Sequence, residues 1–250
     1  MNGENAQTGF SRGENGEFRT THWSIVLAAS GNDSSQAADA LARLCRDYWY
    51  PLYAYIRRRG HESHDAQDLT QAFFARLLEK NFLAAVRRER GKFRWFLLAT
   101  LKRFLANEWN HDHAIKRGGR HITISLDQET AEGRYRHEVA DHTTPDKLFD
   151  QSWAMTVLEH AREQLQQEYR AGEREKLFEQ LKIFLSGDRA PISHAEVGVI
   201  LGLSESAVKV AVHRLRQRYR DCLREQIAQT VSSPAEVDDE IRQLFAAFSG

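Results

Sequence analysis

Residues 201–220, LGLSESAVKVAVHRLRQRYR, contain five basic side chains and no acidic residue after Glu205. The five are Lys209, Arg214, Arg216, Arg218 and Arg220. Lysine and arginine at this density can neutralise phosphates, while serine and histidine beside them can hydrogen-bond to base edges. The chemistry available here is recognition of nucleic acid. It occurs in a chain of 250 residues whose 35 basic and 35 acidic side chains leave no net charge.

Two helices joined by a tight turn would position these side chains. The first would begin at Ser193, and its apolar residues are Val197, Ile200 and Leu201. Gly202 suits a turn that needs a positive φ. Leu203 is expected to fill the gap between the helices, and Ser204 to cap the second helix.

The second helix is predicted to have one apolar face and one polar face. The apolar stripe is Val208, Ala211, Val212, Leu215 and Tyr219. The candidate DNA-binding residues are Ser204, Glu205, Ser206, Lys209, Val210, His213, Arg214, Arg216 and Arg220. Such a helix can lie in the major groove of DNA. The alternative is an amphipathic helix with a solvated basic face, but that leaves the glycine and the cap in register unexplained.

The segment HAEVGVILGLSESAVKVAVHRLRQRYR resembles the promoter −35-reading region of bacterial sigma factors, particularly the extracytoplasmic-function (ECF) group. That family has the pattern E-(I/V)-A-x-x-L-G-(I/L)-S-x-x-(T/A)-V-K followed by basic residues. The matching positions are Glu196, Val197, Leu201, Gly202, Leu203, Ser204, Ala207, Val208 and Lys209. Gly198 stands where the family usually has alanine. The resemblance implies a protein that gives promoter specificity to RNA polymerase and directs transcription initiation.

A second segment, DAQDLTQAFFARLLEK (65–80), is similar to the family's polymerase-docking helix, whose core reads D-L-x-Q-x-x-F. Leu69, Phe73 and Leu77 are spaced to face a core. The resemblance implies that the outer face meets the clamp helices of the polymerase β′ subunit, and it also implies contact with the β flap. The candidate polymerase-binding residues are Asp65, Asp68, Gln71, Phe74 and Arg76.

A third segment, GKFRWFLLATLKRFLANEWNHDHAIKRGGR (91–120), resembles the region that melts and reads the −10 element. Its aromatic residues could stack on unpaired bases between phosphate-binding cations. The candidates are Trp95, Lys102, Arg103, Asn107, Trp109, Asn110, Lys116 and Arg117. Phe96 and Phe104 are expected in the core, and Trp109 fits either place. Asn107 and Asn110 stand where the family has Asp-x-x-Arg, which leaves the base preference open.

The chain is predicted to be all-α, with two small helical domains joined by a flexible acidic linker and the second ending in a helix-turn-helix. Thr144 and Pro145 should begin the first helix of the second domain. The predicted divisions are a disordered N-terminus at 1–20, a first domain at 21–119, the linker at 120–144, the second domain at 145–231 and a helical extension at 232–250.

The extension SSPAEVDDEIRQLFAAFSG is predicted to form a helix capped by Ser233. Its apolar stripe is Val237, Ile241, Leu244, Phe245 and Phe248. One interpretation is simple packing on the second domain. In the other, its four acidic residues compete with DNA for the basic helix, and deleting 232–250 would then strengthen promoter binding. The four are Glu236, Asp238, Asp239 and Glu240.

Other classes of function lack support in the sequence. Cys45 and Cys222 lie far apart, so no disulfide framework is expected. The histidines of HESHD (61–65) and HDH (111–113) lack the spacing of a metal site, and no catalytic or cofactor motif occurs. We expect no enzyme activity, no cofactor and a cytoplasmic protein without membrane insertion. Two alternatives stay open: a stand-alone helix-turn-helix regulator and a pure interaction protein. An anti-sigma factor is a conceivable further partner.

Overall fold

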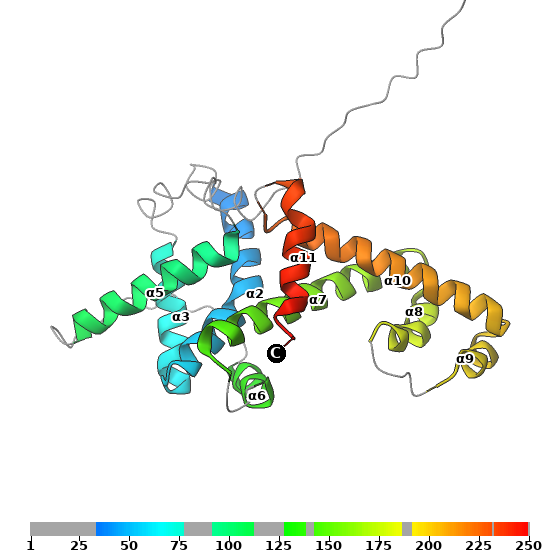
Figure 1. Ribbon diagram of the computed structural model, residues 1–250, viewed down its shortest axis with the longest axis horizontal. Helices are drawn as coiled ribbons and strands as arrows, with labels where there is room; N and C mark the ends of the chain where they lie inside the picture. The colour runs from blue at the N-terminus through cyan, green and yellow to red at the C-terminus, as the bar shows by residue number, and fades with distance from the viewer. Residues whose placement is uncertain are drawn as a thin grey trace, which may run out of the picture.

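The computed structural model describes residues 34–77, 92–112, 128–138, 143–186, 192–231 and 233–249. Every secondary-structure element in these ranges is an α-helix or a short 3-10 helix, which confirms the all-α class (Figure 1). The predicted disordered segment 1–20 lies outside the described residues. In the described part, no helix is long and apolar enough to cross a membrane.

Helix α2 (Ser34–Arg58) is a single helix, although Pro51 lies inside it. Its aromatic and aliphatic side chains are buried on more than one side because α2 packs against both α3 (Ser63–Leu77) and α7 (Pro145–Ala171). The largest of these buried side chains are Tyr48, Trp49, Tyr53 and Tyr55. Gly60 follows the helix with a φ of 96°, a conformation that glycine adopts without strain.

Helix α7 is shared between the two ends of the molecule. The Thr144 side chain caps it by accepting a hydrogen bond of 3.2 Å from the Lys147 backbone, as predicted. An apolar stripe at helical spacing on α7 is buried, and it consists of Phe149, Trp153, Val157, Ala161 and Leu165. In Figure 1, α7 runs from beside α2 towards α10 (Glu205–Ala228), and it packs against both. The Tyr219 hydroxyl of α10 donates to the Leu158 carbonyl at 3.1 Å.

Helix α6 (Gln128–Glu138) lies within the segment that the sequence predicts as a linker. Its Glu132 carboxylate accepts hydrogen bonds from the Tyr53 hydroxyl at 2.6 Å and from the Arg57 guanidinium at 2.9 and 3.0 Å. This part of the segment is therefore a helix fastened to α2.

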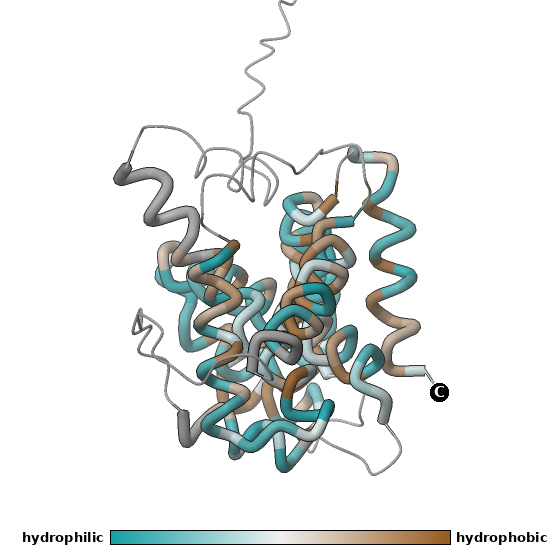
Figure 2. Tube along the Cα trace, turned by 90° about the vertical axis from the view of Figure 1, so that its left-hand side faces the viewer, coloured by the Kyte–Doolittle hydropathy of each residue, from teal (hydrophilic) through white to brown (hydrophobic). Residues whose placement is uncertain are grey.

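The remaining helices occupy opposite ends of the structure. Helix α5 (Phe93–Asp112) lies at one end in Figure 1, and α8 (Glu175–Leu181), the 3-10 helix η2 (Lys182–Phe184) and α9 (His194–Leu201) lie at the other with the start of α10. The chain closes with η3 (Pro234–Glu236) and α11 (Val237–Ala246) near the middle. Hydrophilic and hydrophobic segments alternate along this last helix in Figure 2.

Both cysteines are free thiols in the interior. Cys45 lies on α2, and Cys222 lies on the part of α10 that faces α7. Burial raises the pKa of the Cys45 thiol to about 12 and that of Cys222 to about 11.

Candidate nucleic-acid interface

The caps of α9 and α10 form as the sequence predicts. Ser193 and Glu196 make a reciprocal capping box, in which the Ser193 backbone donates to the Glu196 carboxylate at 2.8 Å. Gly202 ends α9 in the left-handed conformation, with a φ of 67°. The Ser204 side chain then caps α10 by accepting from the Ala207 backbone at 3.2 Å. These caps fix where the exposed start of α10 begins.

The turn between α9 and α10 is closed by backbone and not by the Leu203 side chain. A Cβ at Gly198 would lie 2.6 Å from the Leu203 carbonyl oxygen, and the Leu203 backbone nitrogen donates to the Gly198 carbonyl at 2.8 Å. Because the turn backbone itself fills the gap, Leu203 is 42% exposed, and the prediction that it plugs the gap is wrong. Ile200, also expected in the core, is 58% exposed, whereas Val197 is buried.

All nine candidate residues on and before α10 are exposed: Ser204, Glu205, Ser206, Lys209, Val210, His213, Arg214, Arg216 and Arg220. The opposite face holds α10 in the core through Val208, Val212 and Leu215. The predicted division of this helix into an apolar and a polar face is therefore present.

The cations of α10 differ in what already binds them. Lys209 pairs with Glu205 one turn earlier at 2.6 Å, which lowers the pKa of that carboxyl. Arg218 is bound to Glu168 and Glu225 at 2.5 and 3.1 Å, so it fastens α10 to α7. Arg214 and Arg220 have no ion-pair partner among the described residues. These two guanidinium groups are available to phosphates.

Helix α5 presents a second exposed face. Trp95, Lys102, Arg103 and Asn107 all reach solvent, and Trp95 is 48% exposed. Lys102 forms an ion pair with Asp146 at the start of α7, whereas Arg103 has no ion-pair partner in the described part of the chain. As predicted, Phe96 packs on the core and Phe104 is buried in it. The side chains of Trp109 and Asn110, and the whole of Lys116 and Arg117, lie outside the described part.

Two basic residues at the start of α5 are not on this face. Lys92 and Arg94 are buried and paired with carboxylates, among them Asp239 and Glu240 of α11. The sequence suggested that such acidic residues could compete with DNA for the basic helix α10. In the structure Asp239 and Glu240 pair with Lys92 and Arg94 at the start of α5. Asp238 pairs with α10, at Arg224 near its end. Sequence reasoning missed these partners, since no local pattern joins positions so far apart.

Helix α3 carries the candidate polymerase-binding residues, and it exposes them unequally. Asp65 and Arg76 are exposed, while Asp68 and Gln71 are half-buried. Asp68 lies 3.3 Å from the ring of His64 on the same face. Phe74 is fully buried, because α3 turns a wide apolar face towards its neighbours. Phe74 therefore belongs to the core and is no part of a contact surface.

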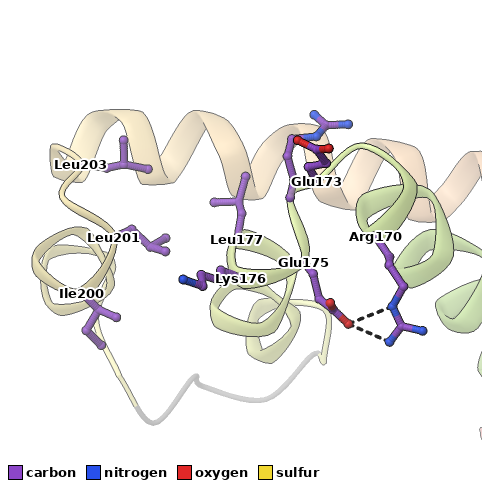
Figure 3. A pocket seen from close by; sticks show the side chains of 9 residues that line it. Arg170, Glu173, Glu175, Lys176, Leu177, Ile200, Leu201 and Leu203 are labelled. Atoms are coloured by element: carbon purple, nitrogen blue, oxygen red, sulfur yellow. Dashed lines mark hydrogen bonds and ion pairs between the residues drawn. The ribbon is translucent and has the colours of Figure 1, made fainter.

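A groove of mixed polarity, which sequence reasoning also missed, lies between the end of α7, the start of α8 and the end of α9. Leu177, Ile200, Leu201 and Leu203 are its apolar lining residues (Figure 3). Charged side chains surround it, and of these Arg170 and Glu175 are paired at 2.7 Å. In the sequence, the groove could have been recognised from the apolar residues 200 and 203, which lie on either side of the Gly202 turn.

The described residues contain no group of three or more histidine, cysteine, aspartate or glutamate side chains that could hold a metal ion. Within the described part of the chain, the candidate interface offers cations, hydrogen-bonding side chains and the exposed indole ring of Trp95. Groups of these kinds can bind nucleic acid without covalent chemistry.

Comparison with known proteins relates the sequence to one protein family. A model of the ECF sigma factor family matches residues 29–225. The chain is similar to the ECF RNA polymerase sigma factor SigE of Mycolicibacterium smegmatis, with 28% identity over 210 residues, covering 83% of this chain and 70% of that protein. No solved structure matches significantly. The family match includes α3, α5, α9 and most of α10, and it ends before η3 and α11.

Proposed function

The chain belongs to the ECF sigma factor family, and from this membership we propose how its surfaces divide the work of a sigma factor that directs transcription initiation. In this proposal α3 docks on core RNA polymerase, the exposed face of α5 binds the opened −10 element, and α10 reads the −35 element as duplex DNA. The observation that supports it most is the exposed polar face of α10, which begins at the Ser204 cap and carries, further along, two arginines without an ion-pair partner among the described residues.

At −35, the first two turns of α10 would contact base edges. Glu205 can accept from cytosine, Lys209 can donate to guanine, and Val210 can contact a thymine methyl group. The Glu205–Lys209 pair must then open so that each partner meets a base. Arg214 and Arg220, further along the helix, would bind phosphates and set the register of the helix in the groove.

At −10, the exposed face of α5 would hold single-stranded DNA. Trp95 offers an indole ring on which an unpaired base can stack, and Arg103 and Asn107 lie further along the same face. Stacking on an aromatic ring contributes about 1–3 kcal/mol per base, which offsets part of the cost of opening the duplex.

The polymerase contacts would come from two surfaces. Asp68 and Gln71 on α3 are polar and accessible on a helix that the core holds rigid, which suits docking on the clamp helices of the β′ subunit. The groove at Leu177, Ile200 and Leu203, which combines apolar and charged side chains, suits an amphipathic helix, and we assign it to the β flap that the family resemblance implies.

The docking surface predicts a selective loss of polymerase binding. Asp68→Ala or Gln71→Ala should weaken association with core polymerase by about tenfold, the range of an interface residue that matters. Glu163→Ala, which removes an exposed carboxylate on α7, is the matched control and should have no effect. Affinity would be measured by titrating core polymerase with the labelled chain. Equal affinities for all three variants and the wild type would show that α3 is not the docking helix.

In-vitro transcription with sigma-free core polymerase on a library of genomic fragments tests the division of work on DNA. We expect starts that share a −35 and a −10 sequence at a fixed spacing. Lys209→Ala should change base preference only at −35, and Trp95→Ala should impair opening only at −10. A stand-alone regulator, which would bind the fragments without producing starts, is disfavoured because the family match includes α3 and α5 as well as α9 and α10.

A further inference from the structure

Helix α11 lies where the two ends of the molecule meet. It packs against α7 and α10, with Val237 and Leu244 buried in the shared core. Figure 1 shows it crossing beside α7 near the centre of the structure. The backbone nitrogen of Phe93, the first residue of α5, donates to the Thr230 carbonyl at 3.2 Å. The chain around α11 is thus attached to the start of α5.

A buried ionic cluster joins α11 to the residues around the start of α5. The Lys92 ammonium lies 2.6 Å from the Asp239 carboxylate and 2.7 Å from that of Glu240. The Arg94 guanidinium donates to the other Glu240 oxygen at 2.6 Å. The side chains of Lys92, Arg94 and Glu240 are 7%, 4% and 0% exposed. Two cations and two carboxylates, from segments far apart in sequence, therefore satisfy each other.

These cations flank the exposed indole of α5. The Lys92 ammonium and the Arg94 guanidinium lie 4.9 and 5.3 Å from the centre of the Trp95 ring. Cations beside an exposed aromatic ring are what proteins use to hold single-stranded nucleic acid, with the phosphate on the cation and the base on the ring. In this structure the two positions next to Trp95 that phosphates would take are filled by carboxylates.

We propose that α11 is an autoinhibitory clasp, whose Asp239 and Glu240 carboxylates take the place of DNA phosphates on Lys92 and Arg94 and cover part of the −10 strand surface in the free protein. The proposal rests on the assignment of α5 to the −10 strand. A carboxylate and a phosphate oxygen make the same charge-assisted hydrogen bonds to lysine and arginine, so one can replace the other.

Opening of the clasp would free the two cations to different degrees. Arg94 is also bound by Asp150 of α7 and lies over the Trp153 ring at 4.6 Å, and neither contact involves α11. Both carboxylates that bind Lys92 come from α11. Lys92 is thus the cation that the movement of α11 releases to a phosphate. The same movement carries Asp238, Asp239 and Glu240 away from incoming DNA.

The clasp is tested by single-strand binding of the full chain. The probe is a fluorescent oligothymidylate of about 12 nucleotides, because stacking on an aromatic ring tolerates any base. Fluorescence anisotropy would give its affinity for the wild type and for D239N/E240Q, which removes both charges at constant shape. We expect the double variant to bind about tenfold more tightly. Adding K92A to it should cancel the gain, because the released cation is then absent.

The control is D238N, which removes a carboxylate from the same helix and leaves the Lys92 cluster intact, since Asp238 pairs with Arg224. Its affinity should equal that of the wild type. Glu240 is buried, so thermal denaturation must show that the double variant folds. D239N alone, at a half-exposed side chain, provides a milder version with a smaller gain.

The outcomes separate the clasp from the function on which it rests. Unchanged or weaker binding by folded D239N/E240Q, while W95A still weakens binding, would overturn the clasp and keep α5 as the strand-binding helix. If W95A and R103A change nothing even in the D239N/E240Q background, the assignment of α5 itself fails.

Discussion

Arg214 and Arg216 lie two positions apart on α10, but their guanidinium groups have different surroundings. Arg216 donates a hydrogen bond of 2.9 Å to the Phe184 carbonyl and so ties α10 to η2. Arg214 is exposed and has no ion-pair partner in the described ranges. The sequence assigns both residues to phosphates, and the structure adds a second role, in stability, to Arg216 alone.

The salt dependence of promoter binding should separate these roles. Arg214→Ala should weaken all promoters similarly and reduce the slope of log K against log salt by about 0.9, the loss of one phosphate contact. Its melting temperature should not change. Arg216→Ala should reduce the slope in the same way, and it should also cost about 1 kcal/mol of folding stability through the lost hydrogen bond. A loss confined to one promoter sequence would make either residue a base reader.

Glu132 is the acid that fastens α6 to α2. Hydrogen bonds from Arg57, and then from Tyr53, with Arg136 3.3 Å away on its own helix, lower the pKa of this carboxyl to about 2. A carboxyl with a lowered pKa stabilises the fold above its ordinary pKa of 4.5, and the stabilisation disappears as the pH falls towards 2.

Glu132→Gln should therefore destabilise the protein in a pH-dependent way. We expect a loss of about 1–3 kcal/mol at neutral pH, because hydrogen bonds to a charged partner are weakened. The difference from the wild type should shrink between pH of about 4.5 and about 2. Urea denaturation over a pH series measures it, with Glu163→Gln, at an exposed position, as control. A difference that does not vary with pH would mean that Glu132 acts through its shape and not its charge.

Single residues were predicted well where the cause is local. The caps at Ser193 and Ser204 depend on neighbours within four positions, so their patterns are readable in the sequence. The sequence does not predict the burial of Phe74, because helical spacing assigns only Phe73 to the core face of α3. In the structure α3 buries both phenylalanines, and the ring centre of Phe73 lies 5.7 Å from that of Phe104. Nor could the sequence predict that Lys92 is buried, since its partners lie in α11.

At the scale of elements, the packing of α9 on the turn that follows it explains why this chain has Gly198 where the family usually has alanine. The end of α9 and the turn after it approach so closely that a Cβ would lie 2.6 Å from the Leu203 carbonyl oxygen. Gly133 on α6 gives the contrast, because a Cβ there would meet nothing within 4 Å. The same substitution should thus have opposite effects at the two positions.

Gly198→Ala should destabilise the protein by about 1–3 kcal/mol, because steric strain exceeds the gain in helix propensity. Gly133→Ala should stabilise it by about 0.4–1 kcal/mol, since only the propensity and the unfolded-chain entropy change. Thermal denaturation would measure both, and −35 duplex binding should weaken in Gly198→Ala alone. If Gly198→Ala were as stable as the wild type, the turn must shift without cost.

The spacing of apolar residues predicts a helix where one face is regularly buried. It does not predict a helix that is held mainly by contacts with residues far away in the sequence. The apolar stripe of α7 follows the helical repeat and is buried. Helix α6 has a polar sequence, and its anchors, Tyr53 and Arg57, lie about 75 to 80 positions away, so the prediction there was a linker. Of the predicted C-terminal stripe, Val237 and Leu244 on α11 are buried, but Phe245 and Phe248, the latter just after the helix, are exposed.

At the scale of the whole molecule, α7 connects two groups of helices. One group contains α2, α3 and α5, and the other contains α8, α9 and α10. Helix α11 adds a second connection, because it packs on α7 and α10 and is ion-paired with Lys92 and Arg94. Cooperativity between the two groups therefore depends on residues 233–249 as well as on α7.

Scanning calorimetry should reveal this dependence. The full chain should unfold in one transition, and a chain ending at residue 231 should show two, because only α7 and the backbone hydrogen bond from Phe93 to Thr230 then join the groups. D238N, which keeps the cluster at Lys92, should retain the single transition. One transition in the truncated chain would show that α11 is not needed to couple both groups.

The two buried thiols give each group its own chemical reporter. Only the thiolate is alkylated at an appreciable rate, and burial holds the pKa values of Cys45 and Cys222 at about 12 and about 11. Each thiol therefore becomes reactive only when its surroundings open. The alkylation rate at Cys45 follows the opening of α2, and the rate at Cys222 follows the separation of α10 from α7. The rates of local opening in the two groups of helices can thus be measured separately in one protein, without engineered labels.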